Sequence, residues 1–365
     1  MSFAKEPAFD HARRPTTGVL IVNLGTPEAP TAPALRRYLG QFLADPRVVE
    51  IPKLLWWPIL HGIILRVRPA KSAHKYASIW MKEGSPLRVW TERLGTLLQG
   101  YLGERGHKVT VKTAMRYGQP SIAAQLDALK AEGATRVLVL PLYPQYSGAT
   151  TASVMDDVFA WGRTVRQIPE LRFINHFHDD PRYIEALADS VRQHWLKEGR
   201  PDKLFMSFHG MPERTLHLGD PYHCECHKTA RLLAERLGLS KDQYVVAFQS
   251  RFGRARWLQP YAEPTLRELG KAGTKRVDVI CPAFVSDCIE TLEEIAMEGK
   301  QAFLSSGGES FHYIACLNDN PAWLKALSEL CGQHMQGWPT LAADQPGEGD
   351  LIKAQERARL LGAAR

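Results

Sequence analysis

Residues 276–294 read RVDVICPAFVSDCIETLEE and organise the rest of the chain. The stretch opens with alternating apolar residues typical of a buried strand, a proline ends it, and a helix is predicted to begin near residues 286–287. On that helix Asp287, Glu290 and Glu294 recur at three- and four-residue steps and would share one face. After a strand of an α/β sheet, such a row would line a ligand crevice. Acids at a helix start also offset the helix dipole while contacting only water, so both interpretations stay open at this point.

The chain repeats a set of landmarks in one order. Three short motifs of the first half recur in the second: LGTP (24–27) and HGMP (209–212), RYG (116–118) and RFG (251–253), PLY (141–143) and PAF (282–284). Strand and helix patterns alternate between them, as in parallel βαβ units. The repeat predicts an α/β fold of two similar halves, each with a parallel β-sheet flanked by helices, facing a central cleft.

We divide the chain into four parts on this basis. Residues 1–16 are expected to be a disordered lead-in, residues 17–172 the N-terminal half with a hydrophobic lip, residues 173–320 the C-terminal half with a His/Glu site, and residues 321–365 C-terminal helices and a tail. The length of 365 residues agrees with about two domains.

Composition limits the classes of partner and location. The formal net charge of +7 favours an anionic partner, but there is no basic block with interleaved aromatic residues, so nucleic acid ranks last. The most apolar run, residues 54–65, is too short to span a membrane, and the N-terminal residues contain no apolar stretch of the kind a secretory signal needs. Six cysteines without an obvious disulfide framework favour a reducing cytoplasm.

His209 is the first candidate for chemistry outside the acidic row. It follows an apolar strand and precedes a glycine, a place that suits an acid/base group or a metal ligand as well as a buried polar plug. Together with carboxylates, its nitrogen would suit a divalent first-row metal. The HCECH motif (223–227) contains more potential metal ligands, but its C-x-C spacing is only a weak signal of a zinc site. We therefore expect a turn that precedes a helix at 229–237, and the role of Cys224 and Cys226 stays open.

The hydrophobic lip, residues 54–65, contains Trp56 and Trp57. Its simplest interpretation is core, but so many large apolar groups also suit the wall of a flat apolar ligand or a contact with a membrane surface. Cations follow directly in the sequence: Arg66, Arg68, Lys71 and Lys75. An apolar wall rimmed by cations suits an amphipathic ligand with carboxylate ends.

Eight ordered motifs between about residues 18 and 338 resemble the ferrochelatase family: VNLGTP, YASIW…GSPL, MRYG, PLYPQYS, SFHGMP, GDPY, FQSRFG and CPAFVSDCIETLEEI. The resemblance implies two Rossmann-like halves and a lyase of haem biosynthesis that inserts Fe²⁺ into protoporphyrin IX, releasing two protons. It implies no tightly bound cofactor and Fe²⁺ as substrate. The expected location is cytoplasmic, and whether the lip contacts a membrane surface peripherally or only covers the ring stays open. Some members hold a [2Fe–2S] cluster near the C-terminus, but only Cys331 lies that late here, so none is expected.

The resemblance also implies roles for individual residues. His209 and Glu290 match the catalytic and iron-binding pair, Asp287 and Glu294 match the acidic line that leads from it, and Cys288 stands where some members carry histidine. The expected substrate-binding residues, including the two lip tryptophans, are Arg68, Lys71, Tyr76, Ser85, Arg116, Tyr146, Trp56 and Trp57.

Two other functions remain at this stage. One is a chelatase for coproporphyrin or another tetrapyrrole, although the apolar lip argues against a more acidic ring. The other is a porphyrin or haem carrier without turnover, which would have no use for a row of acids. The oligomeric state stays open, as does whether His209 acts mainly as a base or as a metal ligand.

Overall fold

Two parallel sheets of equal size form the centre of the molecule. The computed structural model describes residues 3–7 and 10–363. The strand orders, β2-β1-β3-β4 and β6-β5-β7-β8, show the same arrangement twice and confirm the predicted fold class. The first sheet contains β1 (Thr16–Gly25), β2 (Val109–Tyr117), β3 (Ala134–Pro141) and β4 (Glu170–Phe173). The second contains β5 (Lys203–His209), β6 (Tyr244–Gln249), β7 (Arg276–Ile280) and β8 (Ser310–Tyr313).

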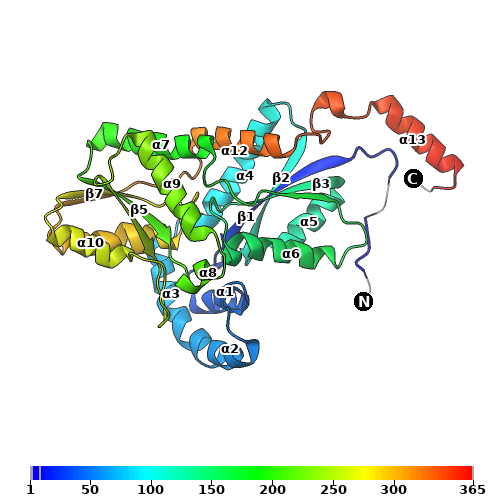
Figure 1. The fold of residues 1–365 in the computed structure, drawn as a ribbon. Coiled ribbons are helices and arrows are strands. Elements are labelled where there is room, and N and C mark those ends of the chain that lie inside the picture. Colours follow the sequence, from blue (N-terminus) through cyan, green and yellow to red (C-terminus); the bar gives the residue numbers. More distant parts are fainter. Residues whose placement is uncertain (1–2, 8–9, 364–365) are drawn as a thin grey trace.

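Helices flank both sheets, and three of them form a separate projection (Figure 1). The projection consists of α1 (Ala32–Ala44), α2 (Lys53–Ile59) with the short π-helix η1 (Leu60–Ile64), and α3 (Leu65–Ile79). The other helices of the first half are α4 (Pro86–Glu104), α5 (Ile122–Ala131), η2 (Gly148–Ala152) and α6 (Ser153–Gly162). Those that follow are α7 (Pro181–Glu198), α8 (Glu213–His217), α9 (Tyr222–Leu237), α10 (Ala262–Lys271), η3 (Glu290–Gly299), α11 (Lys300–Leu304), α12 (Pro321–His334), η4 (Ala342–Asp344) and α13 (Glu348–Leu360).

One hydrophobic core runs through both halves. Its largest cluster of buried side chains includes Leu140 of β3, Phe208 of β5 and Trp323 of α12. Helix α12 packs against α4 of the first half and also against α7. The central strands are apolar on both faces, because helices cover both sides of a parallel sheet. The sheets are therefore held in a fixed relation by shared packing.

The lead-in differs from the expectation of disorder where the structure describes it. The Glu6 carboxylate lies 2.5 Å from Nζ of Lys130 on α5 and accepts hydrogen bonds from the backbone N–H groups of Arg166 and Gln167. An ion pair and two hydrogen bonds tie this segment to the first half. The expectation for residues 1–2 and 8–9 lies outside the described residues.

Three predicted boundaries also shift. Strand β4 belongs to the first sheet and ends at Phe173, so the proposed division between residues 172 and 173 falls inside it. The HCECH motif is not a turn but part of α9, because Asp220 accepts a hydrogen bond from the Tyr222 N–H and the helix begins there. The predicted helix near residues 286–287 begins later, as the π-helix η3 at Glu290.

Candidate functional site

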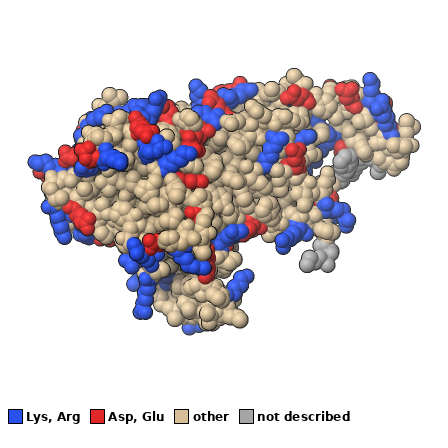
Figure 2. Space-filling view, in the orientation of Figure 1, with Lys and Arg blue, Asp and Glu red and all other residues tan. Residues whose placement is uncertain are grey.

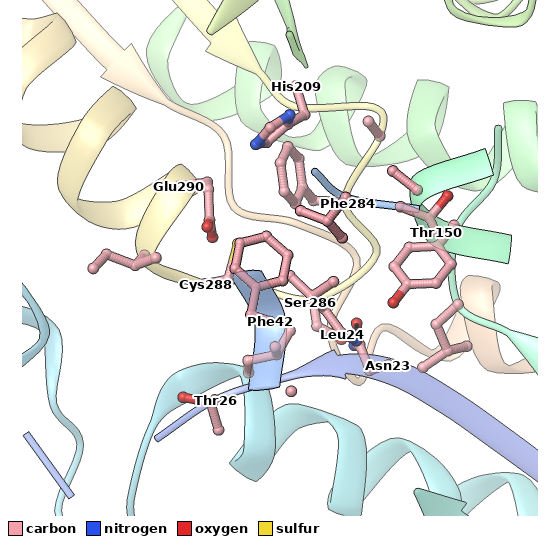
Figure 3. Close-up of a pocket in the computed structure, with 18 of the residues that line it drawn as sticks. Asn23, Leu24, Thr26, Phe42, Thr150, His209, Phe284, Ser286, Cys288 and Glu290 are labelled. Carbon is pink, nitrogen blue, oxygen red and sulfur yellow. Dashed lines mark hydrogen bonds between the residues drawn. The ribbon is translucent and has the colours of Figure 1, made fainter. Parts of the chain in front are cut away.

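A pocket opens where the carboxyl ends of the two sheets meet. Residues that follow β1, β3, β5 and β7 line it, as expected for a ligand crevice in parallel α/β sheets. Its empty volume is about 1270 Å³ with the open mouth included. Most of the wall is apolar, with the aromatic side chains of Phe42, Tyr143, Phe252, Trp257 and Phe284. Figure 3 shows the rings of Phe42 and Phe284 in this wall. Such a wall suits a flat ligand with a large apolar surface.

His209 ends β5 and lies in the pocket wall. Its Nδ1 is 2.6 Å from the carbonyl oxygen of Gly210, and because a carbonyl can only accept, Nδ1 carries the proton and donates it. In the neutral ring, Nε2 then keeps its lone pair. Gly210 permits this geometry, since a Cβ there would lie 2.5 Å from the carbonyl oxygen of Gln249.

Glu290 begins η3 and lines the same pocket. Figure 3 shows the His209 ring directed toward the side of the pocket from which the Glu290 carboxylate projects. Gln249 fixes the two relative to each other. It ends β6, next to β5, and its Nε2 donates to the Glu290 carbonyl oxygen at 2.7 Å. The structure therefore brings the predicted pair together at one pocket.

Glu294 lies one turn behind Glu290, outside the pocket lining. The backbone N–H of Ser250 donates to its carboxylate at 2.6 Å and the Ser250 hydroxyl at 2.5 Å. Burial nevertheless raises the pKa of Glu294, because removing the charged form from water outweighs these hydrogen bonds. Glu290 and Glu294 thus form the part of the predicted acidic row that adjoins the pocket.

Asp287 does not share a helical face with these two glutamates, so the row of three predicted from spacing is wrong. It precedes η3 and is 4% exposed. Its carboxylate accepts hydrogen bonds from Tyr313 Oη at 2.6 Å, Asn318 Nδ2 at 2.7 Å and Thr291 Oγ1 at 3.0 Å. These three hydrogen bonds stabilise the loop between β7 and η3. Asp287 itself is absent from the pocket lining.

Two of the eight predicted substrate-binding residues line the pocket. Tyr76 of α3 does so with its pKa raised well above the ordinary value by burial, so its phenol remains protonated. Ser85 lines the pocket as well, but its Oγ also accepts the Arg88 N–H and caps α4. Both lie on the side of the pocket formed by the first half.

The other six lie outside the pocket lining. Arg116 is engaged in an internal network, with its Nη2 2.8 Å from Asp45 Oδ2 and its Nε 2.7 Å from Ser153 Oγ. Arg68 reaches the mouth, where its guanidinium stacks 5.3 Å from the centre of the Phe252 ring. Of the remaining four, Lys71 is exposed on α3, and Trp57 is exposed beside His61. The other two are held by hydrogen bonds: the Tyr146 N–H donates to Glu225, and Trp56 Nε1 donates to the Leu43 carbonyl.

Sequence reasoning missed several polar groups of the pocket. Tyr143 and Ser286 line it, and each has a buried hydroxyl without a hydrogen-bond partner. Both lie in quoted motifs, PLYPQYS and CPAFVSDC, so their position after strand ends was the available signal. Cys288, which the sequence had already singled out, also lines the pocket, and burial raises the pKa of its thiol well above the ordinary value. A protonated thiol is a poor metal ligand.

The fold has chelatase neighbours among solved structures. The sirohydrochlorin chelatase SirB from Bacillus subtilis subspecies spizizenii in complex with cobalt has a TM-score of 0.51 at 10% identity, covering 88% of this chain and 97% of that chain. SirB from Bacillus subtilis with Fe³⁺ gives 0.50 at 12% identity, covering 88% and 96%. At these identities the likeness defines the class of fold, a chelatase-type pair of Rossmann-like halves around a cleft.

Sequence comparison then defines the family. The profile described as Ferrochelatase matches residues 16–335. Ferrochelatases of Polaromonas sp. (strain JS666 / ATCC BAA-500) and Methylibium petroleiphilum are each 64% identical to this chain, covering all of it and 100% and 99% of their own lengths. The chain belongs to the ferrochelatase family. It is a lyase that inserts iron into a porphyrin in haem biosynthesis, as the sequence predicted.

Proposed function

We propose that the chain inserts Fe²⁺ into protoporphyrin IX and that His209 and Glu290 carry out the reaction. The observation that carries this proposal is the pair itself: an imidazole whose Nδ1 donates to the Gly210 carbonyl, and a carboxylate, both in one apolar pocket. The proposal treats Fe²⁺ as a substrate and requires no resident cofactor or [2Fe–2S] cluster.

Insertion of Fe²⁺ into the free-base ring forms four iron–nitrogen bonds and releases two pyrrole protons. His209 Nε2 accepts the two pyrrole protons in turn as a general base, and each is passed on before the next is taken. Glu290 faces the metal side, where its carboxylate attracts Fe²⁺ and helps to remove its water. A ring held against the aromatic wall can be bent out of plane, which exposes the nitrogen lone pairs toward the metal.

Glu294 receives the protons in the next step of this proposal. Its raised pKa suits a group that gains and loses a proton during turnover. Gln249 Nε2 bridges the Glu290 carbonyl and, at 3.3 Å, the Glu294 carboxylate, so the two acids keep a fixed spacing. Asp287 has no part in this proposed route, because its hydrogen bonds go to Tyr313, Asn318 and Thr291, whereas Gln249 connects Glu290 with Glu294.

The carboxylate ends of the porphyrin would meet the mouth of the pocket. Arg68 and Lys71 on α3 are the cations proposed for this contact, with Tyr76 and Ser85 closer to the ring. Arg116 supports the wall from behind through Asp45, and Tyr146 and Trp56 likewise hold backbone segments. Trp57 belongs to the exposed lip.

The lip is also the proposed place of contact with a membrane surface in a cytoplasmic protein. In the described part of the chain, no helix has the length and apolar character needed to cross a bilayer. Figure 2 shows the projecting lip as a largely uncharged surface with Lys and Arg side chains around its base. Apolar residues rimmed by cations favour an anionic lipid surface.

The decisive experiment measures anaerobic iron insertion by the wild type and Glu290→Gln, with protoporphyrin IX and coproporphyrin in parallel. We expect turnover with protoporphyrin and a loss of about 10²-fold or more in kcat for Glu290→Gln, because the neutral amide no longer attracts Fe²⁺. Preference for coproporphyrin would overturn the substrate assignment. Tight porphyrin binding without turnover by the wild type would favour the carrier, and undiminished turnover by Glu290→Gln would remove that residue from the reaction.

A further inference from the structure

A second group of potential metal ligands lies outside the porphyrin pocket. His176 and His178 belong to the segment between β4 and α7, and Glu225 belongs to the first turn of α9. Nδ1 of His176 is 2.8 Å from Oε1 of Glu225, and Nδ1 of His178 is 3.2 Å from Oε2. The three ligand atoms all lie within 4.8 Å of one another. One small ion could therefore contact all three.

His178 provides an independent sign of a ligand. Its side chain is 6% exposed, and its buried Nδ1 makes no hydrogen bond although it is directed toward Glu225. Buried polar atoms are nearly always paired, so an unpaired nitrogen beside a carboxylate calls for a partner between them. His176 is about half exposed and leaves the group accessible from solvent.

The repeated halves show what a fully paired version of this segment looks like. The segment reads NHFHDDP (175–181) in the first half and ACLNDNP (315–321) in the second. Both follow the last strand of their sheet and end at the proline that starts a helix. In the second, Asn318 donates to Asp287 through its amide at 2.7 Å. In the first, His178 stands at the place of that asparagine and presents an unpaired nitrogen instead.

A third cluster shows the contrasting case. His194 and His312 flank Asp278, but Arg276 already pairs with that carboxylate at 3.0 Å, and Trp195 donates to it at 3.0 Å. A guanidinium that neutralises the carboxylate leaves little attraction for a cation. Glu225 differs: within the residues that the structure describes, no Lys or Arg lies at ion-pair distance from it.

We propose that His176, His178 and Glu225 form a second site for a divalent first-row metal ion, best probed with Zn²⁺. Two imidazole nitrogens and one carboxylate oxygen are a ligand set that zinc and its neighbours accept, with water completing the coordination. The ion joins the segment after β4 to α9 of the second half. Glu225 also accepts the Tyr146 N–H at 2.7 Å, so the site steadies the chain that leads into η2, part of the pocket wall.

The test uses the full chain carrying His209→Ala and Glu290→Gln, which removes the proposed ligands of the pocket. The protein is freed of metal by dialysis against a chelator, and Zn²⁺ binding is measured by competition with a chromogenic chelator. We expect one equivalent to bind and His176→Ala/His178→Ala to weaken it about tenfold or more. The matched control, His194→Ala/His312→Ala, should leave the affinity unchanged.

The proposal is overturned if the background protein binds no Zn²⁺, or if both double variants bind it equally. Should His176→Ala/His178→Ala fail to fold, the single variant of the exposed His176 gives the same comparison. Visible absorption of bound Co²⁺ adds a spectroscopic check, because loss of an imidazole ligand changes the spectrum. Iron insertion is assayed separately with the pocket intact, so failure of the porphyrin proposal would leave the result on this site standing.

Discussion

Glu294 shows how far the position of one carboxyl group can change its chemistry. Two donors from Ser250 would normally favour the ionised form, yet burial raises the pKa of Glu294. The neighbouring Glu290 carboxylate raises it further, while His209 acts in the opposite direction. The fold thus keeps a proton-binding group one helical turn behind the residue that faces the substrate.

Glu294→Gln should change how stability depends on pH. Because the pKa of Glu294 is higher in the folded than in the unfolded chain, the folded state binds more protons between the two values. The free energy of unfolding of the wild type therefore receives a contribution from Glu294 that falls as pH rises through this window. Glu294→Gln lacks that contribution. Between acidic and neutral pH, the free energy of unfolding of Glu294→Gln should therefore rise relative to that of the wild type. The rise should be about 1.4 kcal/mol for each unit by which folding raises the pKa of Glu294.

Urea unfolding between about pH 4 and pH 8 measures this difference. The control is Glu268→Gln on the exposed side of α10, whose curve should run parallel to that of the wild type. Parallel curves for all three proteins would show that Glu294 titrates alike in the folded and unfolded chain.

At the scale of elements, η3 and α3 meet across the mouth of the pocket. Lys75 on α3 lies 3.0 Å from Glu293 Oε2 and 2.8 Å from Glu298 Oε1, both on η3. Burial raises the pKa of Glu293, and Lys75 opposes that change by favouring the charged form. The lysine thus links α3, the helix that follows the lip, to the helix that carries Glu290.

Lys75→Met should reduce the free energy of unfolding by about 1–3 kcal/mol, because it leaves the buried Glu293 carboxylate unpaired. Lys71→Met, one turn earlier on α3 and exposed, should stay within about 0.5 kcal/mol of the wild type. Equilibrium unfolding in urea gives both values. Equal losses for the two variants would mean that the link across the mouth contributes nothing specific.

At the scale of the whole molecule, the lip is the most conspicuous apolar surface. Leu54 is 91% exposed and Trp57 59%, and Leu55, Ile63 and Val67 are exposed near them. A second exposed apolar pair, Leu360 at 87% and Leu361 at 90%, lies at the end of α13, on the opposite end of the molecule from the second sheet (Figure 1). These two surfaces allow a matched comparison.

Leu54→Ser/Leu55→Ser should weaken binding to vesicles of phosphatidylglycerol about tenfold or more, because each inserted leucine contributes about 1.5–3 kcal/mol when fully buried. Leu360→Ser/Leu361→Ser should bind like the wild type. Sedimentation with vesicles at low and high salt gives the affinities. Absence of wild-type binding, or an equal effect of both variants, would contradict a membrane contact through the lip.

Much of this fold was predictable because its signals are local. The apolar strands, the turns that end them and their repetition along the chain predicted two similar halves, each with a parallel sheet, while the order of the strands within each sheet came only from the structure. The start of η3 was not predictable in the same way. It depends on Asp287 being held by Tyr313 and Asn318, which come from distant parts of the sequence.

The same distinction between local signals and distant contacts applies to the candidate site. His209 and Glu290 follow strand ends, so topology alone places them at one crevice. Whether the Arg116 guanidinium is available to a ligand depends instead on Asp45 and Ser153, which come close to it only through tertiary packing. The position of a residue in the sequence can place its side chain at the carboxyl edge of a sheet. It cannot show whether a distant residue already forms an ion pair with that side chain.

The continuous core has a consequence for how the porphyrin is gripped. Since α12 and the cluster around Phe208 and Leu140 join both sheets, the wall that carries His209 cannot swing away from the wall that carries Asn23 and Tyr143 without opening the interior. A second cluster around Leu35, Tyr38 and Leu60 packs α1 and the lip against Tyr117 of β2, so it joins the projection to the first sheet. An entering ring therefore meets two walls whose spacing is set by the packing behind them rather than by the ring itself.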